Sequence, residues 1–158
     1  MVVWKLPPKA KIYEALSAVA DGRVALSIDN NQAEVTSSSG TKTYNVIWNN
    51  DISAITSNDN ASYWQGYLGY PILAVLMVQK QLQYDKSVAA LMAGINWKQV
   101  NRQHRNNYDK ALAQVLKSLE EKGANTGTVR QEVDRIFVQI KHLGLQKLPR
   151  TKRPPGKH

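Results

Sequence analysis

Apolar and polar positions along the first third of the chain change from a helical period to a period of two. Residues 6–24 carry apolar side chains at helical spacing, with Pro8 in the expected first turn and Gly22 as the expected C-cap, which predicts a helix. Alternation of period two then recurs in four short runs: residues 23–29, 32–38, 42–49 and 53–57. Turn residues separate these runs, so we expect a small antiparallel β-meander of three to four strands.

The rest of the chain returns to the helical period. Helices are expected over residues 71–82 with Pro71 in the first turn, over 84–94 with Asp85 as cap, from Asn96 to Gly123 as one long helix, and from Thr128 onward. Asn96 with Gln99, and Thr128 with Gln131, match the capping-box pattern. The sequence therefore predicts an α+β fold in which helices pack on the meander.

The last two predicted helices carry apolar positions at spacings of three and four residues. These positions are Leu112, Val115, Leu116 and Leu119 on one helix, and Val129, Val133, Ile136, Ile140 and Leu143 on the other. A seam of this kind suits a helical hairpin or a short coiled coil, and we expect it to join two or more copies of the chain in a homodimer or a higher homo-oligomer. The predicted organisation is a binding domain over 1–110, a dimerisation segment over 111–146 and a basic, disordered tail over 147–158.

One segment concentrates aromatic rings. YWQGYLGYP, residues 63–71, holds Tyr63, Trp64, Tyr67 and Tyr70, although the whole chain has four Trp, seven Tyr and one Phe. Tyr and Trp tolerate water at their polar edges, so this bias is typical of exposed rings. The predicted third strand adds Tyr44 and Trp48 on one face. Two interpretations remain open at this point: these rings cover the core, or they form a platform on which bases stack.

The charge of the chain is uneven. The formal net charge is +9, and residues 141–158 contain six Lys or Arg and no acid, whereas the other 140 residues contain 15 basic and 12 acidic residues. A basic tail suits a polyanionic partner or simply solubilises the chain. Lys98, Arg102 and Arg105 share one face of the expected long helix, beside Trp97. Apolar runs are too short to span a membrane, the N-terminus lacks a signal-peptide core, and Cys is absent, which together favour the cytoplasm.

Catalytic patterns are not evident. The three His residues have neither metal-ligand spacing nor a carboxylate at a helical offset, and no nucleophile elbow, Walker loop or dinucleotide fingerprint occurs. We therefore expect neither an enzyme nor a bound metal or cofactor. Positive charge combined with stacking rings is what sequence-tolerant binding of single-stranded nucleic acid requires, and no residue separates DNA from RNA as the ligand.

Two segments, YWQGYLGYPILAVLM and LMAGINWKQVNRQHRNNYDKAL, resemble the ThermoDBP-type single-stranded DNA-binding proteins of archaea. The similarity covers residues 40–145. It implies a small α+β domain with a cleft lined by apolar and aromatic residues and edged by basic ones, and a C-terminal segment that dimerises. The residues it assigns to binding are Tyr63, Trp64, Tyr67, Tyr70, Trp97, Lys98, Arg102 and Arg105; Tyr44 and Trp48 join them from the strand pattern.

A second, weaker resemblance is to the SWIM-type zinc finger, over VTSSSGTKTYNVIWNNDISAITSNDN and GYPILAVLM. The four positions of its zinc ligands would be Ile55, Ser57, Gly69 and Pro71, none of which binds zinc through its side chain here. This alternative implies a metal-free module that binds a protein partner or a nucleic acid.

Overall fold

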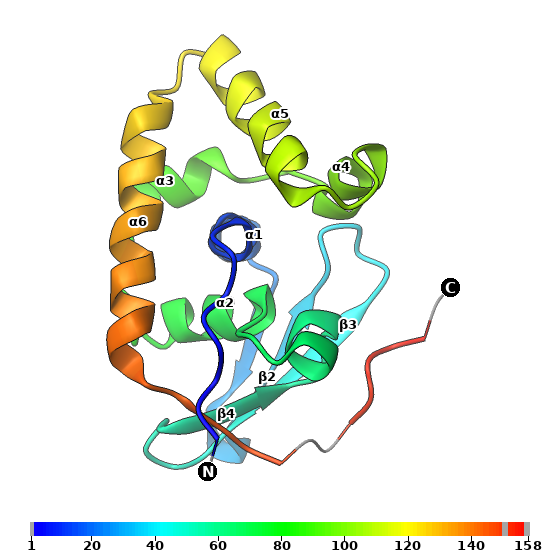
Figure 1. Cartoon of the computed structure of the whole chain (residues 1–158). Coiled ribbons are helices and arrows are strands. Elements are labelled where there is room, and N and C mark those ends of the chain that lie inside the picture. The colour runs from blue at the N-terminus through cyan, green and yellow to red at the C-terminus, as the bar shows by residue number, and fades with distance from the viewer. Residues whose placement is uncertain (1, 150–151, 157–158) are drawn as a thin grey trace.

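The computed structural model describes residues 2–149 and 152–156 of the 158-residue chain (Figure 1). It has an α+β fold, as predicted, but with a five-stranded sheet in place of three to four strands. The strands are β1 (Val24–Ser27), β2 (Gln32–Thr36), β3 (Thr43–Trp48), β4 (Ala54–Ser57) and β5 (Gln146–Lys147). The helices are α1 (Ala10–Ala20), α2 (Tyr70–Val78), α3 (Lys86–Leu91), α4 (Trp97–Gln103), α5 (Tyr108–Glu121) and α6 (Thr126–Leu143).

The sheet has strand order β1-β2-β3-β4-β5 and is mixed. The first four strands form the predicted antiparallel meander, with Ala33 opposite Val46 and Ile47 opposite Thr56. The expected first strand ends early, because Ile28 enters a short 3₁₀ turn over Ile28–Asn30. β5 then adds to β4 in parallel, pairing Ile55 with Lys147. This fifth strand was not predicted, because two polar residues after a helix carry no strand periodicity.

The core lies between the sheet and three layers of helix. Figure 1 shows α2 against the sheet, α1 on the far side of α2, and α3 beyond α1. Residues 71–77 of α2 are all buried, as a helix that is apolar on every side must be. Pro71 stands in its first turn as predicted. α6 runs along one side of these layers and contacts α1, α3 and α5.

The long helix predicted from Asn96 to Gly123 is wrong, because the chain breaks it into α4 and α5. Arg105 and Asn106 have positive φ angles of 52° and 63°, which end α4. Asn107 then restarts the helix, since its side chain accepts a hydrogen bond from the Lys110 amide. Asn96 is confirmed as the N-cap of α4, with its side chain accepting a hydrogen bond from the Gln99 amide.

α6 begins before the predicted capping box. Asn125 is its N-cap and accepts from the Thr128 amide, so Thr128 lies inside the helix. The seam residues Val129, Val133, Ile136 and Ile140 are at most 2% exposed within the single chain. The helical hairpin is not confirmed, because the seam packs into a core shared with α1 and α3. The apolar seam therefore gives no reason to expect a second copy, and the homodimer, like the three-part division of the chain, stays an untested prediction.

Part of the expected disordered tail is described and has defined contacts. Lys147 lies in β5, the Leu148 amide donates to the Ile55 carbonyl (3.1 Å), and the Asn58 side chain donates to the Arg153 carbonyl (3.1 Å). Residues 150–151 and 157–158 of that tail lie outside the described residues. Within the described ranges, no helix is both long and apolar enough to cross a membrane.

Candidate nucleic-acid interface

A cleft of about 580 Å³ opens between the β2–β3 hairpin, α1, α4 and the segment before α2. Six aromatic residues line it: Tyr44, Trp64, Tyr67, Tyr70, Trp97 and Tyr108. Four basic residues also line it: Lys11, Arg23, Lys42 and Lys98. The cleft thus combines flat rings with positive charge, and its volume falls within the range of about 300–1,000 Å³ that ligand pockets occupy.

The local structure of YWQGYLGYP explains why its rings are spaced by glycines. Residues Ala61–Gln65 form one π-helical turn, which Gly66 ends with a φ of +75°. The turn exposes Trp64, which is 66% accessible, while the Tyr63 ring packs edge-on against it with centroids 4.6 Å apart. Beyond Gly66 the chain bridges to Lys5 at Tyr67 and then enters α2. The glycine therefore lets the turn present Trp64 to solvent and Tyr67 to the cleft.

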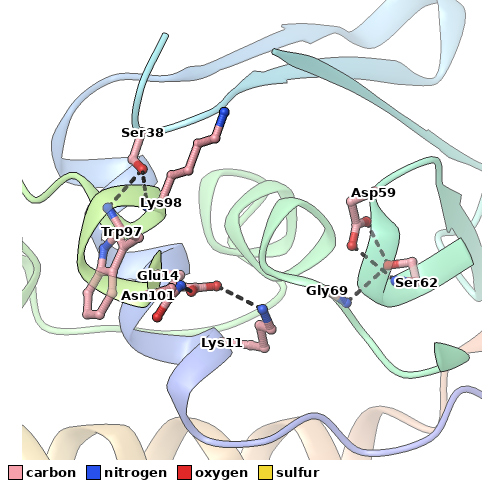
Figure 2. A network of polar contacts seen from close by, with 9 residues as sticks. All are labelled: Lys11, Glu14, Ser38, Asp59, Ser62, Gly69, Trp97, Lys98 and Asn101. Atoms are coloured by element: carbon pink, nitrogen blue, oxygen red, sulfur yellow. Dashed lines mark hydrogen bonds and ion pairs between the residues drawn. The ribbon is translucent and has the colours of Figure 1, made fainter. Parts of the chain in front are cut away.

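A buried carboxylate holds this segment in place. Asp59, 4% exposed, accepts hydrogen bonds from Ser57 Oγ (2.6 Å), Ser62 Oγ (2.7 Å) and the Ser62 amide (3.0 Å). Ser62 Oγ in turn accepts from the Gly69 amide at 3.1 Å (Figure 2). A Cβ atom at Gly69 would lie 2.0 Å from Asp59 Oδ2, so only glycine fits there. The network fixes the turn that carries Trp64 to the end of β4 and the start of α2.

The floor of the cleft carries a buried ion pair. Lys11 Nζ lies 3.2 Å from Glu14 Oε2, and Glu14 Oε1 accepts from Asn101 Nδ2 at 3.2 Å (Figure 2). Burial lowers the pKa of Lys11, but the Glu14 carboxylate, together with Tyr108 and Tyr67, more than offsets this and leaves that pKa above its ordinary value. Lys11 Nζ also stands 4.7 Å from the centre of the Tyr108 ring. These contacts tie α1 to α4 and α5 and leave Lys11 charged.

The β2–β3 hairpin is fastened to the start of α4. Ser38 Oγ accepts hydrogen bonds from the Trp97 amide at 2.9 Å and the Lys98 amide at 3.5 Å (Figure 2). The hydroxyl thereby satisfies amides that the first turn of a helix leaves unpaired. The fastening brings Lys98, an exposed residue, to the same cleft as Lys42, a partly exposed residue of the hairpin, and we call these two lysines the rim of the cleft.

Three tyrosines form a neutral wall of the cleft. Tyr44 and Tyr70 meet edge-on, with ring centroids 6.2 Å apart and planes at 89°. Burial raises the pKa of Tyr44, Tyr67 and Tyr70 above the ordinary value near 10. Their hydroxyls are therefore protonated at neutral pH and can donate as well as accept hydrogen bonds.

The structure brings six of the ten predicted site residues to this cleft: Tyr44, Trp64, Tyr67, Tyr70, Trp97 and Lys98. Trp48 is 6% exposed and packs in the core, because its side of β3 faces the helices. Trp97 lines the cleft but is only 5% exposed. Arg102 and Arg105 are exposed but do not line the cleft. Arg102 lies in α4 one turn beyond Lys98, whereas Arg105 has a positive φ after the end of α4 and so leaves the expected common face.

Four basic or aromatic residues that line the cleft were not predicted as site residues from the sequence: Lys11, Arg23, Lys42 and Tyr108. Arg23 donates through Nη1 to the Thr36 carbonyl (2.7 Å), while its Nη2 is buried without a partner. Trp97 Nε1 is likewise buried and unpartnered. Within the part of the chain that the structure describes, these are two of four such buried side-chain atoms.

The positions of the SWIM-type resemblance have structural roles. Ile55 is in the core, Ser57 donates to Asp59, Gly69 donates to Ser62, and Pro71 begins α2. Among the described residues, no group of three or more His, Cys, Asp or Glu side chains could hold a metal ion.

No curated protein and no solved structure is detectably similar to this chain. The sequence model of a family described as "uncharacterised conserved protein UCP014422" matches residues 4–146, which include strands β1 to β4, every helix described above and the whole cleft. The resemblance to ThermoDBP-type proteins stays a prediction. The chain belongs to the family of the uncharacterised conserved protein UCP014422.

Proposed function

We propose that this protein binds single-stranded DNA without sequence preference, in the ring-lined cleft. The observation that carries the proposal is the meeting of six aromatic residues and four basic residues around one cavity, from elements far apart in the chain. Rings provide stacking surfaces that accept any base, and cations neutralise phosphates. The proposal concerns the single chain, because the seam that suggested a dimer is buried within it.

The charges of the cleft decide which part of a nucleotide goes where. Glu14 and Asp59 line the inner wall, and both carboxylates already accept hydrogen bonds from the protein. Acids repel phosphates, so the backbone of a strand belongs at the rim, beside Lys42 and Lys98. Within the described residues, neither lysine has a carboxylate within ion-pair distance. The bases then point inward, toward the rings.

The rings differ in what they offer a base. Trp64 is 66% exposed and Tyr108 is 36% exposed, so each presents a face without any movement of the fold. Tyr67 is partly exposed beside them. One stacked base contributes about 1–3 kcal/mol, so these three rings are the main source of binding energy. Tyr70 and Tyr44 contact each other and serve as the wall behind them.

The test is a fluorescence anisotropy titration with labelled single-stranded DNA, RNA of the same sequence and the DNA duplex. The variant K42Q/K98Q removes both rim charges, and K152Q/R153Q removes two charges from the described part of the tail as a matched control. We expect tight binding to single-stranded DNA that weakens as the salt concentration rises. Each phosphate contact contributes about 0.7 to the slope of the logarithm of affinity against the logarithm of salt concentration, so the slope for K42Q/K98Q should be lower by about 1.4.

Two outcomes would contradict the proposal. Preference for the duplex would mean that the protein recognises only the negative charge of the phosphate backbone. Loss of binding in K152Q/R153Q but not in K42Q/K98Q would place the site in the tail. Stronger binding to RNA than to DNA would keep the cleft as the site and change the ligand.

A further inference from the structure

A second cleft lies next to the first. Its volume is about 530 Å³, and it shares Trp64 and Gln65 with the ring-lined cleft. Its other walls come from the N-terminal segment, β4, the start of the π-helical turn and β5 with the residues after it. The exposed indole of Trp64 therefore stands at the boundary of both clefts.

Backbone hydrogen bonds fix the walls of this second cleft. The Trp4 amide donates to the Leu145 carbonyl (2.9 Å), and the Lys147 amide donates to the Val2 carbonyl (2.7 Å). The Lys5 amide donates to the Gly66 carbonyl at 3.2 Å, which joins the N-terminal segment to the turn that carries Trp64. A surface built from paired backbone is preorganised, so a ligand meets it without an ordering cost.

The charged residues described in the lining of the second cleft are both basic. Lys5 and Lys147 line it, and no Asp or Glu does so among the described residues. Lys147 Nζ stands 4.9 Å from the centre of the Trp4 ring, and it would lie 3.1 Å from a Cβ atom at position 66. The absence of a side chain at Gly66 thus leaves room for the ammonium group. Unlike the first cleft, this one has no acid that would keep a phosphate at the rim.

The rest of the lining suits the sugar and base of a nucleotide. Val2 is 67% exposed, and Leu148 and Pro149 add apolar surface beside it. Trp64 offers the ring at the boundary with the first cleft. The second cleft thus combines basic residues, exposed apolar surface and the Trp64 ring. It continues, on the other side of Trp64, the combination of positive charge and rings found in the first cleft.

We infer that the second cleft binds the nucleotides that follow those held in the first, so that one single strand passes over Trp64 and occupies both clefts. This inference rests on the proposed function. In this arrangement Trp64 stacks on a base at the junction, and Lys5 and Lys147 neutralise phosphates of the extended strand. The binding site is then longer than the ring-lined cleft alone.

Length dependence tests the inference. Labelled oligothymidylates, from a dinucleotide to about 16 nucleotides, are titrated into the full-length protein and into K5Q/K147Q. Lys5 is exposed, and K5Q alone is included so that the result does not depend on a change within β5. K117Q, an exposed lysine of α5 that lines neither cleft, is the control for lost charge.

We expect wild-type affinity to rise with length beyond the oligonucleotides that fill the first cleft. K5Q/K147Q should bind the shortest oligonucleotides as wild type does. It should bind the longer ones about two- to fivefold more weakly for each lysine replaced. The slope of the logarithm of affinity against the logarithm of salt concentration should also be lower by about 0.7 for each lysine. K117Q should match wild type. The same length dependence in K5Q/K147Q and wild type would overturn the inference and leave the proposed function intact. Failure of every length to bind would contradict the proposed function itself, and the inference with it.

Discussion

Replacing Trp64 by alanine separates binding from folding. The indole is 66% exposed and packs edge-on against the Tyr63 ring, with the ring centroids 4.6 Å apart. A pair of this kind contributes about 0.5–1.5 kcal/mol beyond buried area. In a chain of this size a loss of 1 kcal/mol lowers the melting temperature by about 2–4 °C. Trp64→Ala should therefore fold and melt within a few degrees of wild type.

Binding should fall much further than stability. One stacked base contributes about 1–3 kcal/mol, so losing it should raise the dissociation constant by about 5- to 150-fold. Trp64 borders both clefts, so no other ring replaces it at the junction. Trp64→Phe keeps a smaller ring at the same position and should recover part of the loss. The graded order of wild type, Phe and Ala would identify stacking as the cause.

The assay is anisotropy with labelled single-stranded DNA at one moderate salt concentration, with thermal unfolding followed by circular dichroism. Val138→Ala is the control, because Val138 is a 50% exposed apolar residue of α6 that lines neither cleft. If Trp64→Ala folds normally and binds as tightly as wild type, the reasoning about exposed rings is refuted.

The remaining predictions concern the fold that positions the cleft. Trp48→Ala should lower stability by about 3–5 kcal/mol in urea unfolding, because its ring is buried, and a folded variant with weaker binding alone would contradict this. Gly69→Ala should cost at least about 1–3 kcal/mol, since its methyl group would collide with Asp59; an unchanged midpoint would count against the network. Burial raises the pKa of Tyr70, so stability should fall as pH rises above about 10, where only the unfolded state ionises. Tyr70→Phe should show a shallower fall over the same pH series, and an equal fall would exclude Tyr70 as the cause.

The sequence predicts the regular elements of the fold because each has a local cause. The meander follows from period-two alternation, and Asn96 caps α4 through its own side chain. No glycine or proline marks the break at Arg105 and Asn106 in the sequence, although both residues adopt positive φ there. β5 forms because β4 offers it a free edge, and its two residues carry no pattern of their own.

The candidate site is predictable in its rings and less so in its charges. YWQGYLGYP marks the ring-bearing turn through composition alone. Lys11 and Glu14 lie three residues apart on α1, a spacing that signals an ion pair but not its burial at the floor of a cleft. Trp48 was expected at the site because its side of β3 could not be assigned to core or solvent without knowing which face α2 covers.

Photocrosslinking tests the central claim most directly. Single-stranded DNA carrying 5-iododeoxyuridine is bound to the full-length protein and irradiated, and the crosslinked residues are identified by mass spectrometry. The proposed binding mode predicts crosslinks at Trp64, Tyr67 and Tyr108, which unlabelled single strand suppresses and duplex does not. Crosslinks confined to the tail around Lys152 and Arg153, or equal suppression by duplex, would contradict it.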